Sequence, residues 1–268
     1  MIRVAALLGV ILGAGGIGTA VGQAAPDSAQ GDTVSADPSL AERFDIGETM
    51  LFEGRFGILR LGRAAMRVVG IDTIRGTPTL HFRFQIRVNA AGLYRMDNKF
   101  ESWVGWDDFF SRRFVQDYHE TGQTRTNRYE IYPDSGFYRR PDVDTALTAA
   151  RAPLDDTAFF YFVRTLDLEP GDTLRFDRYF RPDRNPVIIT VIERDTIEVP
   201  AGRFPTIVIH PIIKGGGIFR EAANARLWIS DDPDRLIVQM KSKFGFGTVT
   251  LRLTGVEDRS PRQDSRDR

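Results

Sequence analysis

One stretch of this chain alternates so strictly that it constrains the backbone more than any other feature. In TLHFRFQIRVN, residues 79–89, apolar and polar side chains take turns from Leu80 to Asn89. The apolar members are Leu80, Phe82, Phe84, Ile86 and Val88, and the polar members are His81, Arg83, Gln85, Arg87 and Asn89. Successive side chains of a β-strand point to opposite faces, so this period of two predicts a strand with one buried and one solvated face. A helix would spread the same residues around its circumference.

Most of the remaining sequence also divides into short β-branched or aromatic segments that turn residues separate. Further strands are expected over residues 50–56, 64–71, 94–106, 112–119, 124–132, 174–180, 187–193, 206–213, 225–229, 236–241 and 248–253. No alternation of strands with helices is visible, which argues against a parallel sheet and a nucleotide-binding crevice. The sequence therefore predicts a mainly β fold, either a strongly curved antiparallel sheet or a partly open β-barrel.

Turn residues mark where this sheet reverses. The glycines of GILRLGR, residues 57–63, indicate a turn between the first two strands. In IEVPAGRF, Pro200 fixes φ and Gly202 accepts positive φ, so the Pro-Ala-Gly predicts a hairpin. Because nothing in that loop except Arg203 is titratable or nucleophilic, we interpret it as a structural turn and not as a binding loop.

One segment, residues 153–172, departs from the β pattern. Asp155 and Asp156 precede the apolar run AFFYFV, and a Pro-Gly ends the segment's apolar part. Asp155 is a suitable N-cap, because its carboxylate can accept hydrogen bonds from backbone N–H groups of the first turn. We expect one α-helix over about residues 156–167. Its apolar residues cover nearly the whole circumference, so we expect it to be buried in the concavity of the sheet.

The first 24 residues have the layout of a secretory signal peptide. Arg3 precedes an uncharged apolar run over residues 4–17, and Gly22 and Ala24 stand at the spacing that a signal peptidase recognises. An uncleaved membrane anchor is the alternative, although the apolar run is short for a span of about 20 residues. We predict export to the periplasm or cell envelope, with no membrane-spanning segment after cleavage.

Composition sets the remaining boundaries. Residues 25–44 are rich in Ala, Asp, Ser and Pro and are expected to form a flexible lead-in, and residues 257–268 a disordered charged tail. Residues 45–256 are then a single β-rich domain.

Charge and cysteine content exclude several classes of function. Lys and Arg total 36 and Asp and Glu total 36, which argues against a nucleic-acid binder, because such a protein needs a basic surface. The chain has no Cys, so it has no disulfide, no thiol nucleophile and no Cys-based zinc site.

Candidate chemical sites are few. His81, His119 and His210 show no metal-ligand spacing, and no nucleophile motif is visible. The carboxylates of residues 231–234 could bind Ca²⁺ but lack the EF-hand pattern, so a solvated turn is expected. The glycines of residues 214–219 indicate a loop and not a phosphate site. We therefore expect no cofactor, no metal and no enzymatic activity.

Aromatic residues are frequent in the middle of the chain. If the helix does not fill the concavity, an apolar cavity suited to a lipid or another apolar molecule would remain. Its expected lining is Trp103, Trp106, Phe159, Phe160 and Tyr161. The alternative is an ordinary dry core. Three functions follow: an envelope protein that binds an apolar ligand, a scaffold that meets a protein partner through its sheet, or an enzyme whose site the sequence does not reveal.

An ordered set of motifs resembles the DUF3108 family of exported bacterial proteins. The motifs are GETMLFEGRFGILRLGRA, DTAFFYFVRTL with the preceding Leu154 and Asp155, LEPGDTLRF, IEVPAGRF, ARLWISDDPDRLIVQM and GFGTVTLRL, and they span about residues 47–255. Ile237 departs from the pattern, since a Pro is expected after the WIS turn. The resemblance implies export and a β-rich fold, and it implies no reaction.

Overall fold

The computed structural model describes residues 38–90, 94–214, 224–244 and 247–257. In this part of the chain, the strands are β1 (Thr49–Phe56), β2 (Leu59–Ile74), β3 (Thr77–Ala90), β4 (Tyr94–Gly105), β5 (Ser111–Glu120), β6 (Gln123–Tyr132), β7 (Phe137–Arg140), β8 (Val143–Thr148), β9 (Thr173–Phe176), β10 (Val187–Val199), β11 (Gly202–Ile212), β12 (Arg226–Ser230), β13 (Ile237–Phe244) and β14 (Gly247–Glu257). The helices are α2 (Asp156–Phe162) and the short 3-10 helices η2 (Pro38–Arg43), η3 (Pro133–Ser135), η4 (Val163–Thr165) and η5 (Pro182–Arg184).

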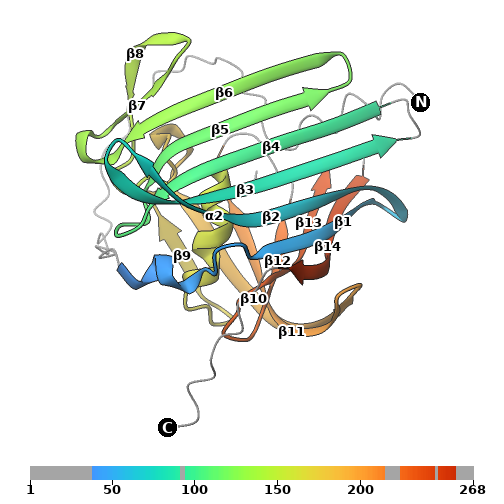
Figure 1. The fold of residues 1–268 in the computed structure, drawn as a ribbon. Coiled ribbons are helices and arrows are strands. Elements are labelled where there is room, and N and C mark those ends of the chain that lie inside the picture. Colours follow the sequence, from blue (N-terminus) through green and yellow to red (C-terminus); the bar gives the residue numbers. More distant parts are fainter. Residues whose placement is uncertain (1–37, 91–93, 215–223, 245–246, 258–268) are drawn as a thin grey trace.

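All these strands belong to one antiparallel sheet, in the order β8-β7-β6-β5-β4-β3-β2-β1-β14-β13-β12-β11-β10-β9. The strands β1 to β8 form one meander and β9 to β14 a second, and the pairing of β1 with β14 joins the two. The sheet bends strongly, so that its two arms lie on either side of α2 (Figure 1). This confirms the predicted curved antiparallel sheet around one helix.

The sheet is not closed, because its end strands β8 and β9 do not pair with each other. Irregular segments that come after these two strands contact each other instead. Leu154 and Tyr179 form an isolated bridge, and the Phe180 N–H donates to the carbonyl of Leu154 at 2.9 Å. The buried guanidinium of Arg178 donates from Nε to the carbonyl of Ala152 at 2.9 Å. The fold is therefore a partly open barrel.

Strand β3 carries the core in the manner its alternation predicts. Leu80, Phe82, Phe84, Ile86 and Val88 are all buried, and the interleaved polar residues point to the outer face. Because directly paired residues of an antiparallel sheet point to the same side, the buried face continues onto the neighbouring strands. The inner faces of both arms supply most of the core, with α2 between them.

Helix α2 begins as predicted but ends earlier. The Asp155 carboxylate accepts from the backbone N–H groups of Thr157 and Ala158 at 2.9 and 3.0 Å, which confirms the N-cap. The helix ends at Phe162, not near residue 167, and one 3-10 turn follows. The Thr165 hydroxyl donates to the Phe162 carbonyl at 2.7 Å, which satisfies a group that another helical turn would have used.

Three boundary predictions are corrected. Residues 38–43 of the expected flexible lead-in form the 3-10 helix η2, and Ala41 and Phe44 are buried in the core, so the packed domain begins before residue 45. Part of that lead-in, residues 25–37, lies outside the described residues, as do the predicted signal peptide and residues 258–268 of the predicted tail. Strand β14 extends to Glu257. The turn expected over residues 57–63 is only two residues long, because β2 already starts at Leu59.

The hairpin prediction at Pro200 is confirmed, since Val199 of β10 pairs with Gly202 of β11. Within the described residues, no helix has the length and apolar character needed to cross a bilayer.

Candidate functional site

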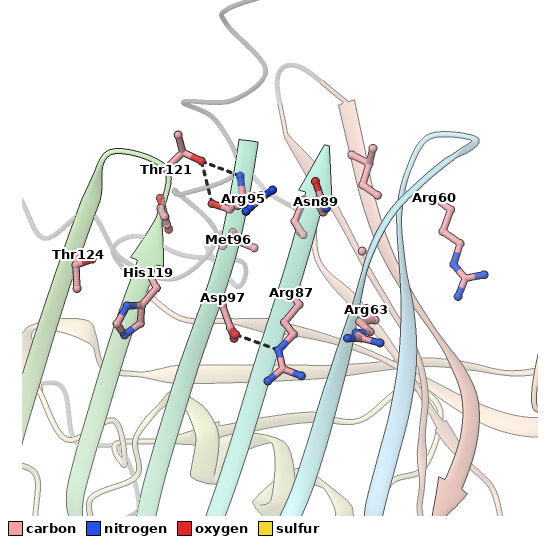
Figure 2. A pocket seen from close by; sticks show the side chains of 14 residues that line it. Arg60, Arg63, Arg87, Asn89, Arg95, Met96, Asp97, His119, Thr121 and Thr124 are labelled. Carbon is pink, nitrogen blue, oxygen red and sulfur yellow. Dashed lines mark hydrogen bonds and ion pairs between the residues drawn. The ribbon is translucent and has the colours of Figure 1, made fainter. Parts of the chain in front are cut away.

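A pocket of about 850 Å³ lies at the ends of strands β2 to β6 in the first arm (Figure 2). Its lining combines four arginines with polar and apolar side chains. The lining residues are Arg60, Leu61, Gly62, Arg63, Arg87, Val88, Asn89, Arg95, Met96, Asp97, His119, Glu120, Thr121 and Thr124. Pockets of this size accommodate small-molecule ligands.

The arginines come from adjacent strands because of the register. Arg63 of β2 pairs with Arg87 of β3, and Arg87 in turn pairs with Asp97 of β4. The Arg87 Nε donates to the Asp97 carboxylate at 3.0 Å, while the side chains of Arg63 and Arg95 have no hydrogen bond or ion pair with a described residue. Figure 2 shows Arg63, Arg87 and Asp97 side by side on neighbouring strands. The pocket therefore offers exposed positive charge to a ligand.

Hydrogen bonds fix the rim of the pocket at β4 and β5. The Asn98 amide donates to the Glu120 carboxylate at 2.8 Å, and the Tyr94 hydroxyl donates to the same carboxylate at 3.2 Å. Burial and the negative charge of Glu120 raise the pKa of Tyr94. The Arg95 backbone N–H donates to the Thr121 hydroxyl at 2.8 Å, which holds the two strand ends together. These hydrogen bonds therefore connect β4 to β5 at the rim of the pocket.

A smaller depression of about 360 Å³ lies beside the first one and shares Arg60, Arg63 and Arg87 with it. It is lined further by Leu51, Phe52, Ala64, Ala65, Gln85 and Thr254. Guanidinium groups recognise phosphate and carboxylate in a planar, two-point geometry. The combination of arginines with aliphatic surface suits a molecule that has an anionic group and an apolar part.

The residues predicted to line an apolar cavity are not brought together around one. Phe159, Phe160 and Tyr161 of α2 are buried, and side chains of the sheet fill the space against them. The ring of Tyr161 stacks on that of Phe82 with centroids 3.8 Å apart, and Phe160 meets Phe84 edge-on at 5.5 Å. None of the five predicted residues lines the pocket at the strand ends. Around these helix residues, the dry-core alternative describes the packing.

Trp103 lies on the other side of the sheet from the helix. Its neighbours Ser102 and Val104 are buried on the inner face, whereas Trp103 stacks on His81 with centroids 4.3 Å apart on the outer face. Its indole N–H donates to the Asp72 carboxylate at 3.0 Å. The prediction that Trp103 shares a cavity with the helix aromatics is therefore wrong. Trp106 follows β4 and packs, partly buried, against the core.

A buried carboxyl–hydroxyl cluster surrounds Asp155. The Ser102 hydroxyl donates to the Asp155 carboxylate at 2.6 Å, and the Asp155 backbone N–H donates to the Ser111 hydroxyl at 3.0 Å. All three residues have no exposed surface. A nucleophile needs a base and access to substrate, and this cluster has neither a His partner nor an opening. It anchors α2 to β4 and β5.

The other candidate residues have structural surroundings. His81 Nε2 lies 3.1 Å from the Glu101 carboxylate, His210 Nδ1 lies 2.6 Å from the Ala225 carbonyl oxygen, and His119 lines the pocket. In the 231–234 turn, Asp232 accepts from the Ser230 hydroxyl at 2.8 Å and so stabilises the turn itself. No group of three metal-ligating side chains occurs among the described residues. Most of the 214–219 loop lies outside them.

Comparison with protein families gives one assignment. The model described as "Protein of unknown function (DUF3108)" matches residues 51–254. The chain belongs to the DUF3108 family. The resemblance expected from the order of the motifs is thus confirmed, despite Ile237.

Solved structures show what the DUF3108 fold is similar to. A β-barrel-like protein of the DUF1849 family from Brucella abortus has a TM-score of 0.53 at 12% identity, over 80% of this chain and 98% of that one. A candidate lipoprotein from Parabacteroides distasonis has 0.35 at 10% identity, over 80% and 96%. A candidate exported protein with a YmcC-like fold from Bacteroides fragilis has 0.32 at 13% identity, over 80% and 97%. No protein of curated function matches the chain. The first similarity supports the barrel-like fold and nothing beyond it.

Proposed function

We propose that this DUF3108 protein is an exported, non-catalytic protein of the cell envelope that binds a lipid or similar amphipathic molecule with an anionic group. The binding site is the pocket at the ends of β2 to β6. The observation that carries this proposal is the gathering of Arg60, Arg63, Arg87 and Arg95 around a pocket that also has aliphatic lining. Export rests on the signal-peptide layout of residues 1–24.

The chemistry of the lining supports an amphipathic ligand. Arg63 and Arg95 can give their N–H groups to a phosphate or carboxylate without breaking an ion pair with a described residue. Leu61 supplies partly exposed apolar surface for a hydrocarbon part, whereas Val88 and Met96 are buried on the inner face of the sheet. A purely apolar ligand would leave the arginines unused, whereas a small inorganic anion would leave most of the volume unfilled.

The experiment is native mass spectrometry of the purified protein with dihexanoyl phosphatidylglycerol and, separately, with dihexanoyl phosphatidylcholine. We expect the anionic lipid to bind about tenfold more tightly, since a charged hydrogen-bonded contact contributes on the order of a factor of ten. Arg95→Glu should abolish that preference. Arg67→Glu is the matched control, because Arg67 is an exposed arginine of β2 that does not line the pocket.

Equal binding of the two lipids, or an Arg95→Glu variant that behaves like the Arg67→Glu control, would refute the proposal. The same spectra, recorded on protein purified from its own envelope, also report any lipid that has been carried through.

A second candidate function is a scaffold that binds a protein partner at a sheet edge. The end strand β8 pairs only with β7, and all six of its residues are exposed, including Val143 and Leu147 at 37% and 40%. A free edge can accept a strand from another chain. Reproducible recovery of one protein partner that Leu147→Pro disrupts, without bound lipid, would favour this function.

A further inference from the structure

The sheet register aligns basic side chains from both ends of the chain in two rows across the outer face. In the first row Arg60 of β2, Arg55 of β1, Thr250 of β14, Lys241 of β13 and Arg226 of β12 are successive pairing partners. In the second row Arg87, Arg63, Glu53, Arg252 and Gln239 are successive partners. Directly paired residues point to the same side of a sheet, so the rows form one surface. We call the seven Arg and Lys residues of these two rows the basic band.

The basic band is a local excess of positive charge in a chain that has no formal net charge. Its rows contain one acidic residue, Glu53, and beyond the end of the second row Asp97 of β4 pairs with Arg87. The side chain of Arg60 is 66% exposed and that of Arg55 36%, and they lie 3.7 and 3.4 Å from the Glu53 carboxylate, which is itself nearly buried. Lys241 is also exposed. Because Lys+Arg and Asp+Glu are equal in number over the whole chain, the band is a feature of the arrangement and not of the composition.

An apolar tip stands at the end of the same hairpin. Ile58 is 90% exposed and Leu59 is 59% exposed, the highest values among the large hydrophobic side chains of the described residues. They follow Gly57, whose φ of 57° makes the tight turn between β1 and β2. Figure 1 shows this turn at the edge of the molecule, beyond the body of the sheet. Within residues 54–68 the hairpin has four Arg and no Asp or Glu.

We infer that the β1–β2 hairpin and the basic band dock the protein onto an anionic phospholipid bilayer. Ile58 and Leu59 enter the interface between head groups and acyl chains, and Arg55, Arg60 and Lys241 contact lipid phosphates. Interfacial binding of this kind combines buried apolar area with attraction to anionic lipid. A nucleic acid would use the charge and leave the aliphatic tip exposed.

This inference goes beyond the proposed function, since it concerns a bilayer surface and not one molecule in a pocket. The two share Arg60, Arg63 and Arg87, and they place a bound lipid beside the membrane from which it would come. Either can fail without the other, because Ile58 and Leu59 do not line the pocket and Arg95 is not part of the basic band.

The test is co-sedimentation of the exported protein with vesicles of phosphatidylcholine containing phosphatidylglycerol, and with vesicles of phosphatidylcholine alone. Ile58→Ser with Leu59→Ser should lower the partition coefficient by about tenfold on the anionic vesicles. The matched control is Ile71→Ser, since Ile71 is 55% exposed near the opposite end of β2. All variants carry the same N-terminal segment, so a difference in vesicle binding between them is due to the hairpin substitutions.

A second pair of variants tests the charge. Arg60→Gln with Lys241→Gln should lower binding to the anionic vesicles by about tenfold or more and leave neutral vesicles unaffected. Arg67→Gln with Arg203→Gln removes the same charge outside the basic band and should change neither.

The inference is overturned if the Ile58 and Leu59 variant sediments like the Ile71 control. It is also overturned if binding does not depend on phosphatidylglycerol, or if the purified protein binds no vesicle and the hairpin is instead required for capture of a protein partner. If a hairpin variant no longer sediments with vesicles but still retains lipid in native mass spectra, the pocket proposal stands. The inference about the hairpin is judged only on the sedimentation of the hairpin variants.

Discussion

Arg164 and Glu48 form a two-point ion pair inside the core. The distances are 2.7 Å from Nη1 to Oε1 and 3.0 Å from Nη2 to Oε2, and both side chains are 2% exposed. The guanidinium also donates to the carbonyls of Asp234 and Arg235 at 3.1 and 3.0 Å. One side chain after α2 therefore ties the start of β1 to the turn between β12 and β13.

Breaking this pair should be strongly destabilising. In Glu48→Gln the Arg164 charge stays buried without its carboxylate, so we expect the free energy of unfolding to fall by about 3 kcal/mol. Urea denaturation measures the change, with the exposed Glu193→Gln as control. Glu48→Leu with Arg164→Met removes both charges and should recover much of the loss. A loss below about 1 kcal/mol in the single variant would show that the pair contributes little.

Asp155 should make stability depend on pH. Burial raises the pKa of this carboxyl to about 7, against hydrogen bonds from Ser102, Ser111 and the Ala158 backbone. Because the folded pKa exceeds the unfolded value of about 3.8, Asp155 favours the folded state fully below pH 3.8. This contribution is lost as the pH rises through 7. Asp155→Asn should remove it and keep the cap, since an amide oxygen also accepts from backbone N–H groups.

Thermal unfolding of wild type and Asp155→Asn across this pH range checks the sign. The difference in melting temperature should move in favour of the variant as the pH rises. Asp144→Asn, at an exposed position of β8, should show no such trend. A parallel response of all three proteins would contradict a titrating Asp155.

The predictable part of the fold is the part that local chemistry decides. The alternation from Leu80 to Val88 requires one buried face, Asp155 is a suitable N-cap, and Pro200 with Gly202 requires a reversal. Each of these depends on residues close in the sequence, so no knowledge of the tertiary structure was needed. The end of α2 depends on distant partners, because Glu48 holds Arg164, and the helix therefore ends at Phe162 and not at the expected residue 167.

The prediction for Trp103 of β4 fails for an identifiable reason. Asn98 and Ser102 point to the inner face although they are polar, since Asn98 donates to Glu120 and Ser102 to Asp155. Trp103, the apolar residue beside Ser102, consequently points outward. An inward serine is recognisable only once its buried acceptor is known, and that acceptor lies 53 positions along the chain.

The arginine pocket and the basic band could not be found from the sequence. Arg55 and Lys241 become neighbours of Thr250 only because β1 and β13 both pair with β14. The equal totals of acidic and basic residues conceal this segregation. The one local indication of a basic surface in the sequence is the run from Gly54 to Val68, which contains four Arg and no Asp or Glu.

Glu101 should give an acid dependence of the opposite sign to that of Asp155. It accepts from His81, Arg83 and Lys99 at 3.1, 2.8 and 3.0 Å. Burial alone would raise the pKa of Glu101, but these hydrogen bonds lower it to about 2. The stabilisation is therefore present above the unfolded value of about 4.5 and is lost as the pH falls through 2.

Glu101→Gln should lower the urea midpoint at neutral pH and flatten its fall between pH 4.5 and 2. The control is again Glu193→Gln. Gln85→Glu is unsuitable as a control, because it adds a charge on β3, the strand next to that of Glu101. An unchanged acid limb in Glu101→Gln would show that other carboxylates dominate acid unfolding.

Gly62 tests the close approach of β2 and β3 beside the pocket. A Cβ at Gly62 would lie 2.2 Å from the Arg87 carbonyl oxygen and 3.0 Å from a Val88 methyl, so the strands would have to move apart. Gly62→Ala should lower the free energy of unfolding by about 1–3 kcal/mol and weaken binding of dihexanoyl phosphatidylglycerol. The matched control is Gly255→Ala in β14, where a Cβ meets nothing within 4 Å and stability should change by less than about 0.5 kcal/mol. If both alanine variants unfold at the same urea concentration, the contact between Gly62 and β3 does not limit the position of the pocket arginines.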